Sequence, residues 1–133
     1  MDNEKKVSVV IPVYESQATL DRCLIALEAQ CYEDFSVILI DSSPSNDCEK
    51  IVMEHHPWVE YEHVTKRMLP HEARNYGVKK ASADLLIFTD PDIYAPPDWI
   101  LNLVEAFSAH GGVIVGSVRC YGSNWLDMGE HIA

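Results

Sequence analysis

The sequence predicts an α/β fold in which a mainly parallel sheet carries helices on both faces. Short apolar segments rich in β-branched residues alternate along the chain with segments whose apolar residues recur at helical spacing. Most of the strand-like segments are continuously apolar, as parallel strands are when both faces are covered. The chain has 133 residues, so we expect a single α/β domain over residues 1–133.

Five segments are expected to form strands. Four are nearly continuous runs of apolar residues, whereas the fifth alternates with Glu60, Glu62 and His63, as an edge strand with one wet face does. The continuous segments are residues 7–13, 36–40, 85–89 and 113–118, and the alternating segment is 59–65.

Four helices are expected between these strands. Asn46 is a suitable N-cap for the second helix. In the third, Ala73, Gly77 and Ala81 follow one another at four-residue spacing, and such a stripe of small residues lets a helix lie close to a sheet. The fourth is expected to end at Gly111. The expected helices are residues 16–30, 46–55, 71–82 and 97–109.

The chain is strongly acidic, with 21 acidic and 10 basic residues and a formal net charge of −11. Such a surface repels phosphate backbones, so we expect no nucleic-acid partner. No segment approaches the roughly 20 apolar residues of a membrane span, and the N-terminus lacks the apolar stretch of a signal peptide. The four cysteines form no CxxC pair, which favours free thiols in a reducing compartment. We expect a cytoplasmic protein, either free or held at the cytoplasmic face of a membrane through parts outside this sequence.

Acidic residues follow three of the expected strands. Glu15 follows the first strand, Asp41 the second, and Asp90 and Asp92 the strand at 85–89. Because ligands of open parallel sheets bind beyond the carboxyl ends of the strands, these carboxylates are expected at one edge of the sheet. The six glycines form neither GxGxxG nor GxxxxGK[ST], so the usual phosphate-binding loops are absent from the sequence. A nucleotide bound here would need a divalent cation between the carboxylates and its phosphates.

The Asp90-Pro91-Asp92 segment has the form of a metal site. In an extended segment, side chains at positions i and i+2 point the same way, so both carboxylates can face one Mg²⁺ or Mn²⁺ ion. Roughly one DxD pair is expected by chance in a chain of this composition, and a plain Asp-Pro turn is the alternative. Its place directly after an apolar strand favours the metal site. The adjacent His55 and His56 lack a further ligand at helical spacing, so we do not favour a metal site there.

Arg74 is the candidate anion-binding residue. It lies near the start of an expected helix, where a cation is locally unfavourable because that end of a helix already carries partial positive charge. A ligand with phosphates or a group of carboxylates would explain its position. The alternative is a solvated arginine paired with Glu72 or Asp84.

Several motifs together resemble the family 2 glycosyltransferases of the GT-A fold. They are VSVVIPVYE at 7–15, VILIDSSPSND at 37–47, ARNYG at 73–77, ADLLIFTDPD at 83–92 and PDWI at 97–100. The resemblance extends from about residue 7 to residue 118. It implies the Rossmann-like, nucleotide-binding half of that fold.

The resemblance implies an inverting transfer of a sugar from a nucleotide-diphosphate donor, expected to be a UDP-sugar, to an acceptor hydroxyl. The acceptor and the sugar are not identified by these motifs. The resemblance also implies a role for each matching residue: Pro12, Tyr14 and Glu15 line the base and ribose, Asp41 hydrogen-bonds the base, Arg74 faces the diphosphate, and Asp90 with Asp92 holds the ribose and the metal.

The sequence departs from the family after the DxD motif. In the family the general base comes from the second half of the catalytic domain, whereas here 41 residues follow Asp92. Asp127 and Glu130 lie in no recognisable base motif, so we interpret them as surface charges. We therefore expect the donor-binding half of a longer transferase, with little or no activity alone and an uncovered sheet edge that invites pairing with a second copy.

Two other functions are alternatives to this one. The first is a non-catalytic module that binds a nucleotide or nucleotide-sugar and is completed by another chain. The second is a receiver-type signalling domain, which also gathers acids at strand ends. It fits poorly, because it needs a lysine after a late strand and Lys79 and Lys80 precede the strand at 85–89.

Overall fold

The computed structural model describes residues 5–119. Contacts divide the chain into two compact units, residues 1–101 and residues 102–133. The whole sheet and every candidate site residue belong to the first unit.

The strands and helices predicted before residue 111 all form, each with ends within four residues of the prediction. The first helix begins later than predicted because the backbone N–H groups of Thr19 and Leu20 both bond to the carbonyl of Ser16, which makes a turn ahead of the helix. The elements are β1 (Val7–Val13), α1 (Leu20–Glu28), β2 (Phe35–Asp41), α2 (Asp47–His55), β3 (Glu60–His63), α3 (Pro70–Lys80), β4 (Leu85–Phe88) and α4 (Trp99–His110).

The four strands form one sheet in the order β3-β2-β1-β4, and every pairing is parallel. β1 pairs with β2 along its full length, so that Val7 lies opposite Phe35 and Val13 opposite Asp41. β3 is an edge strand, as its alternating pattern predicted. The predicted α/β fold with a parallel sheet is therefore confirmed.

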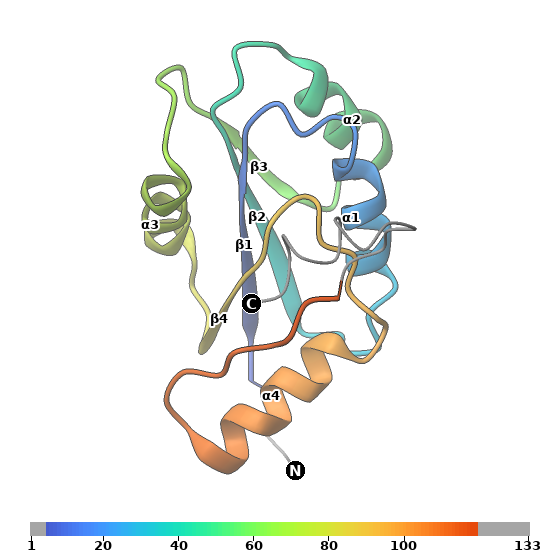
Figure 1. The fold of residues 1–133 in the computed structure, drawn as a ribbon, viewed down its shortest axis with the longest axis vertical. Coiled ribbons are helices and arrows are strands. Elements are labelled where there is room, and N and C mark those ends of the chain that lie inside the picture. Colours follow the sequence, from blue (N-terminus) through green and yellow to red (C-terminus); the bar gives the residue numbers. More distant parts are fainter. Residues whose placement is uncertain (1–4, 120–133) are drawn as a thin grey trace. The chain divides into compact units, whose positions relative to one another are not determined.

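Helices cover both faces of the sheet (Figure 1): α3 lies on one side, and α1 and α2 lie on the other. The small residues of α3 allow a very close approach. A Cβ atom placed on Gly77 would lie 2.4 Å from Cγ1 of Val10 in β1. Ala73, one turn earlier, packs with Ile38 and Ile40 of β2. The predicted role of the small-residue stripe is confirmed.

The centre of the sheet is dry. All seven residues of β1 are buried, and Val9, Ile11, Val37 and Leu39 have no exposed surface. Burial of these side chains supplies most of the driving force for folding. Within residues 5–119, no helix is both long and apolar enough to cross a membrane.

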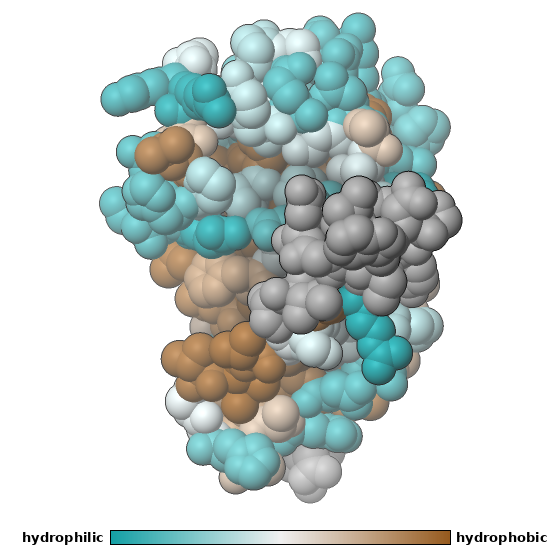
Figure 2. Space-filling view, in the orientation of Figure 1, coloured by the Kyte–Doolittle hydropathy of each residue, from teal (hydrophilic) through white to brown (hydrophobic). Residues whose placement is uncertain are grey.

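The strand predicted at 113–118 was wrong. Residues 113–118 form no strand, and Val113 and Val115 are exposed to 89% and 85%. In the view of Figure 2, a hydrophobic area, coloured brown, lies at the lower left of the surface. A strand persists only when a neighbour takes up its backbone hydrogen bonds, and no described segment pairs with these residues. The preceding helix ends as predicted, since Gly111 has a φ of +66° and its N–H bonds to the carbonyl of Phe107 at 2.7 Å.

Candidate functional site

A pocket of about 730 Å³ lies where the strand order of the sheet reverses. From β1 the chain runs to β2 and β3 on one side, and it then crosses to β4 on the other side of β1. Open parallel sheets bind ligands at such a reversal, beyond the carboxyl ends of the strands. The walls are residues 12–16, 18 and 19 at the end of β1, residues 67–70, 73 and 74 around the start of α3, and residues 90–92 after β4.

Six of the seven residues predicted for the site line this one pocket. Asp41, the seventh, does not line it, although it lies opposite Val13 of the pocket wall in the pairing of β2 with β1. The six that line it are Pro12, Tyr14, Glu15, Arg74, Asp90 and Asp92.

Glu15 joins the loop after β1 to the loop after β2. It is a non-glycine residue with a φ of +47°, a conformation that costs energy for an L residue unless the surroundings hold it. Its N–H donates to Oγ of Ser43 at 2.7 Å, and its Oε1 accepts from Oγ of Ser45 at 2.9 Å. The bond from Ser45, followed by one from Gln17, lowers the pKa of Glu15 below its usual value. The charge of Glu15 is thus fixed at the pocket rim.

Asp41 is fully buried, and two donors already occupy its carboxylate. Oδ1 accepts from the N–H of Ser43 at 2.8 Å, and Oδ2 accepts from the hydroxyl of Tyr61 at 2.6 Å. Burial, and then the bond to Asp41, raises the pKa of Tyr61. The same Ser43 accepts from Glu15, so Asp41 is connected to the pocket through Ser43.

Arg74 reaches across the pocket from α3 to Asp90. Its Nη2 lies 2.7 Å from Oδ1 of Asp90, and the two side chains are 33% and 49% exposed. Neither carboxylate that was the alternative partner is used, because Glu72 accepts from the N–H of Leu69 and Asp84 from the N–H of Lys6. Nε of Arg74 is buried and has no hydrogen-bond partner among the described residues. An unpaired buried donor in a pocket wall is where an acceptor on a ligand would bond.

Asp90 and Asp92 lie in a turn, whereas we expected an extended segment. The N–H of Ile93 bonds to the carbonyl of Asp90 at 3.2 Å, and Pro91 occupies the second turn position, which proline favours. Both carboxylates still line the pocket. Asp92 has neither a hydrogen-bond nor an ion-pair partner within residues 5–119, so its oxygens are available to a ligand.

Arg67 lines the pocket and was missed by the sequence analysis. It lies in the loop between β3 and α3, and its guanidinium carbon is 4.3 Å from the centroid of the Tyr14 ring. The sequence signal was the basic pair Lys66 and Arg67 seven residues before Arg74, in a chain with few basic residues.

A family model for glycosyl transferase family 2 matches residues 8–133. The chain belongs to glycosyl transferase family 2. The resemblance found in the sequence motifs is thereby confirmed.

Curated relatives of this family 2 chain are transferases. It is 32% identical over 123 residues to the validoxylamine A glucosyltransferase of Streptomyces hygroscopicus subsp. jinggangensis, covering 87% of the chain and 29% of that protein. It is 36% identical to the undecaprenyl-phosphate 4-deoxy-4-formamido-L-arabinose transferase of Klebsiella pneumoniae subsp. pneumoniae, covering 86% of the chain and 37% of that protein. The chain therefore spans about a third of the length of these relatives.

Solved structures share the fold. Residues 1–349 of S. aureus TarS, in complex with UDP-GlcNAc, superimpose with a TM-score of 0.70 at 21% identity, over 84% of this chain and 37% of that TarS chain. The Pyrobaculum calidifontis mannosyltransferase PcManGT, in complex with GDP-Man and Mn²⁺, has a TM-score of 0.70 at 24% identity, over 88% of this chain and 35% of PcManGT. At these identities the likeness shows the fold alone.

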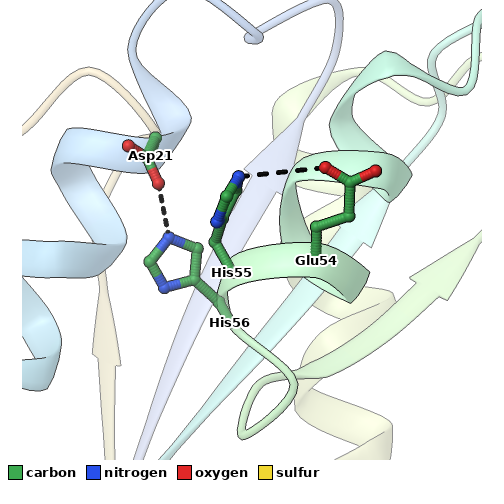
Figure 3. A network of polar contacts seen from close by, with 4 residues as sticks. All are labelled: Asp21, Glu54, His55 and His56. Carbon is green, nitrogen blue, oxygen red and sulfur yellow. Dashed lines mark hydrogen bonds and ion pairs between the residues drawn. The ribbon is translucent and has the colours of Figure 1, made fainter.

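The other candidate groups lie elsewhere in the family 2 chain. His56 is 2% exposed, and its Nε2 lies 2.7 Å from Oδ1 of Asp21, whereas His55 faces Glu54 (Figure 3). The two imidazoles thus contact different carboxylates.

Among the described residues, no three His, Cys, Asp or Glu side chains are grouped to hold a metal. Cys23, Cys31 and Cys48 are free thiols, and Asp127, Glu130 and Cys120 lie outside the described residues.

Proposed function

We propose that this chain binds the nucleotide-diphosphate sugar donor of an inverting, metal-dependent glycosyltransferase. One observation carries the proposal. The pocket at the strand-order reversal brings together residues of three separate segments, including Tyr14, Arg74 and Asp92. An aromatic ring, a cation and a free carboxylate are the groups that would bind a base, a diphosphate and a metal.

Arg74 is the proposed diphosphate-binding residue. Its Nη2 is held by Asp90, and its unpaired Nε remains to donate to a phosphate oxygen. Guanidinium–phosphate bonds are charge-assisted and therefore strong for hydrogen bonds. In this arrangement Asp90 fixes the orientation of Arg74 before the donor arrives.

The oxygens of Asp90 and Asp92 suit Mg²⁺ or Mn²⁺. Oδ1 of Asp90 accepts from Arg74, which leaves its other oxygen and both oxygens of Asp92. Mg²⁺ is commonly held by one or two carboxylates together with substrate phosphates and water, so two carboxylates are enough. When bound, the ion would neutralise charge on the departing diphosphate. The Mn²⁺ in the complex of PcManGT supports this part of the proposal.

The base and ribose are proposed to bind beside Pro12, Tyr14 and Glu15. For Asp41 the geometry supports positioning more directly than contact with the base, because it holds Ser43, and Ser43 in turn holds the strained Glu15. UDP is our expected nucleotide, with GDP and dTDP as the alternatives, and the sugar nucleotides bound by TarS and PcManGT support UDP and GDP respectively.

The reaction would be a direct displacement. The acceptor hydroxyl attacks the anomeric carbon of the sugar, the bond from that carbon to the diphosphate breaks, and the hydroxyl proton passes to a general base. We assign no described residue as that base. The proposed share of this chain is to bind and orient the donor.

The test is a thermal-shift measurement with the chain. A ligand that binds the native state raises the melting temperature, so UDP with Mn²⁺ should raise it more than either alone. Asp92→Asn should abolish this synergy. Asp98→Asn, an exposed aspartate outside the pocket wall, is the matched control and should retain it. If UDP, GDP and dTDP all fail to shift the wild-type chain in the presence of Mn²⁺, the proposal is wrong. If the wild-type chain does bind, release of free sugar or diphosphate in the presence of acceptors distinguishes an enzyme from a non-catalytic binding module.

A further inference from the structure

The pocket holds a second guanidinium with no assigned role. Arg67 is an exposed residue of the loop between β3 and α3, and it lines the same pocket as Arg74, Asp90 and Asp92. Its guanidinium is stacked on the ring of Tyr14, at 4.3 Å from the ring centroid.

The stack orients Arg67 without neutralising it. An aromatic face attracts a guanidinium electrostatically, and the N–H groups at the edge of the stacked plane stay available as donors. Within residues 5–119, no carboxylate lies within 4.0 Å of this guanidinium, and Arg67 has no hydrogen bond. In a chain with a net charge of −11, an unpaired arginine on a pocket wall is a strong candidate for binding an anion.

Arg74 gives the contrast. Its guanidinium is paired with Asp90 at 2.7 Å, so part of its charge is offset before any ligand binds. Arg67 has no such partner among the described residues, and residues 65–67 of its loop are exposed. The two arginines come from neighbouring segments of the pocket wall, one before α3 and one within it.

We propose that Arg67 binds the diphosphate of the nucleotide donor directly, as a second phosphate-binding residue beside Arg74. The inference rests on the proposed function, in which the pocket takes a nucleoside diphosphate. In the unbound chain the guanidinium is held against the Tyr14 ring. The Arg67 side chain therefore loses less conformational entropy when it binds the phosphates.

The experiment compares the binding of UDP and of uridine, in Mn²⁺, by calorimetry. Arg67→Ala should weaken UDP binding by about tenfold, the effect of losing one charge-assisted hydrogen bond, and should leave uridine binding within about twofold. Arg67→Lys should recover part of the loss, because it keeps the charge but not the planar fork. Lys66→Ala is the matched control. It removes the same charge one residue away, outside the pocket wall, and should weaken UDP binding by no more than about twofold.

Two outcomes would overturn this inference alone. In the first, Arg67→Ala weakens UDP binding no more than Lys66→Ala does, so that only the general charge matters. In the second, Arg67→Ala weakens uridine and UDP by the same factor, so that Arg67 acts through Tyr14 rather than on the phosphates. If the wild-type chain binds none of UDP, GDP and dTDP, the proposed function fails as well, and this inference falls with it.

Discussion

The guanidinium of Arg74 and the carboxylate of Asp90 lie 2.7 Å apart and join α3 to the segment that follows β4. This contact connects two walls of the pocket that are 16 residues apart in the chain. Because both side chains are partly exposed, solvent screens the pair and its contribution to stability is small. Its importance should therefore appear in ligand binding more than in folding.

Arg74→Ala should lower the free energy of unfolding by less than about 1 kcal/mol, because exposed and half-exposed ion pairs contribute little. The same change should weaken UDP binding in Mn²⁺ by about tenfold or more, since a charged donor to the phosphates is lost. Urea unfolding and calorimetry measure the two effects. Lys79→Ala, exposed on the same helix and outside the pocket wall, should change neither. Unchanged UDP affinity in Arg74→Ala would contradict the role proposed for Arg74.

Gly77→Ala should destabilise the fold by about 1–3 kcal/mol, although alanine is the better helix former. The added Cβ would lie 2.4 Å from Cγ1 of Val10, which is fully buried, so the helix or the core side chain would have to shift. Gly116→Ala is the matched control, because nothing lies within 4 Å of the Cβ it would add. Urea unfolding of both variants tests the close approach of α3 to β1. Equal stabilities of the two variants would mean that α3 does not lie so close.

Tyr61→Phe should lower the free energy of unfolding by about 1.5–3 kcal/mol, because it removes a hydrogen bond to the buried carboxylate of Asp41. The folded-state pKa of Tyr61 is raised above its usual value of 10.0 by burial and by this bond. Its contribution to stability is therefore complete below pH 10 and is lost as the pH rises further. The difference between wild type and Tyr61→Phe should shrink above that pH.

Tyr94→Phe is the control for this prediction, since it also removes one phenol but breaks no hydrogen bond found in residues 5–119. Urea unfolding at pH 7 and at pH 10.5 gives the comparison. If Tyr61→Phe and Tyr94→Phe are equally stable at pH 7, the bond to Asp41 contributes nothing.

Cysteine alkylation should be selective in the native protein. Burial, followed by the charges of Asp92 and Asp90, raises the pKa of Cys23 to about 12, and burial also raises the pKa of Cys48. Because the thiolate is the reacting species, neither should react with iodoacetamide at pH 8, whereas the exposed Cys31 should. Peptide mass spectrometry reads out each site, with urea-unfolded protein as the control in which all react. If Cys23 is labelled as fast as Cys31, the Cys23 thiol is not protected by burial in the native protein, and this prediction is wrong.

The parallel sheet could be predicted because its central strands are apolar without interruption. β1 and β2 are covered on both faces, so their sequences carry no alternation. Residues 113–118 are also apolar almost without interruption, and yet they form no strand. Composition reports how well a segment would suit a sheet, and it carries no information about whether a neighbouring strand is present to pair with it.

The pocket could be predicted for a topological reason. Parallel strands place their carboxyl ends at one edge, so Glu15 and Asp92 had to lie near one another once β1 and β4 were neighbours. Asp41 is buried with a hydrogen bond from Tyr61 of β3, and no spacing in the sequence reveals that pairing. Arg67 was missed because an exposed loop arginine belongs to no periodic pattern.

Each wall of the pocket comes from a different stretch of chain: residues 12–19, 67–74 and 90–92. A peptide that ends before β4 lacks Asp90 and Asp92, and one that starts at α1 lacks the aromatic ring of Tyr14. A pocket with all three walls is consequently a property of the assembled sheet, complete only when β4 is paired beside β1.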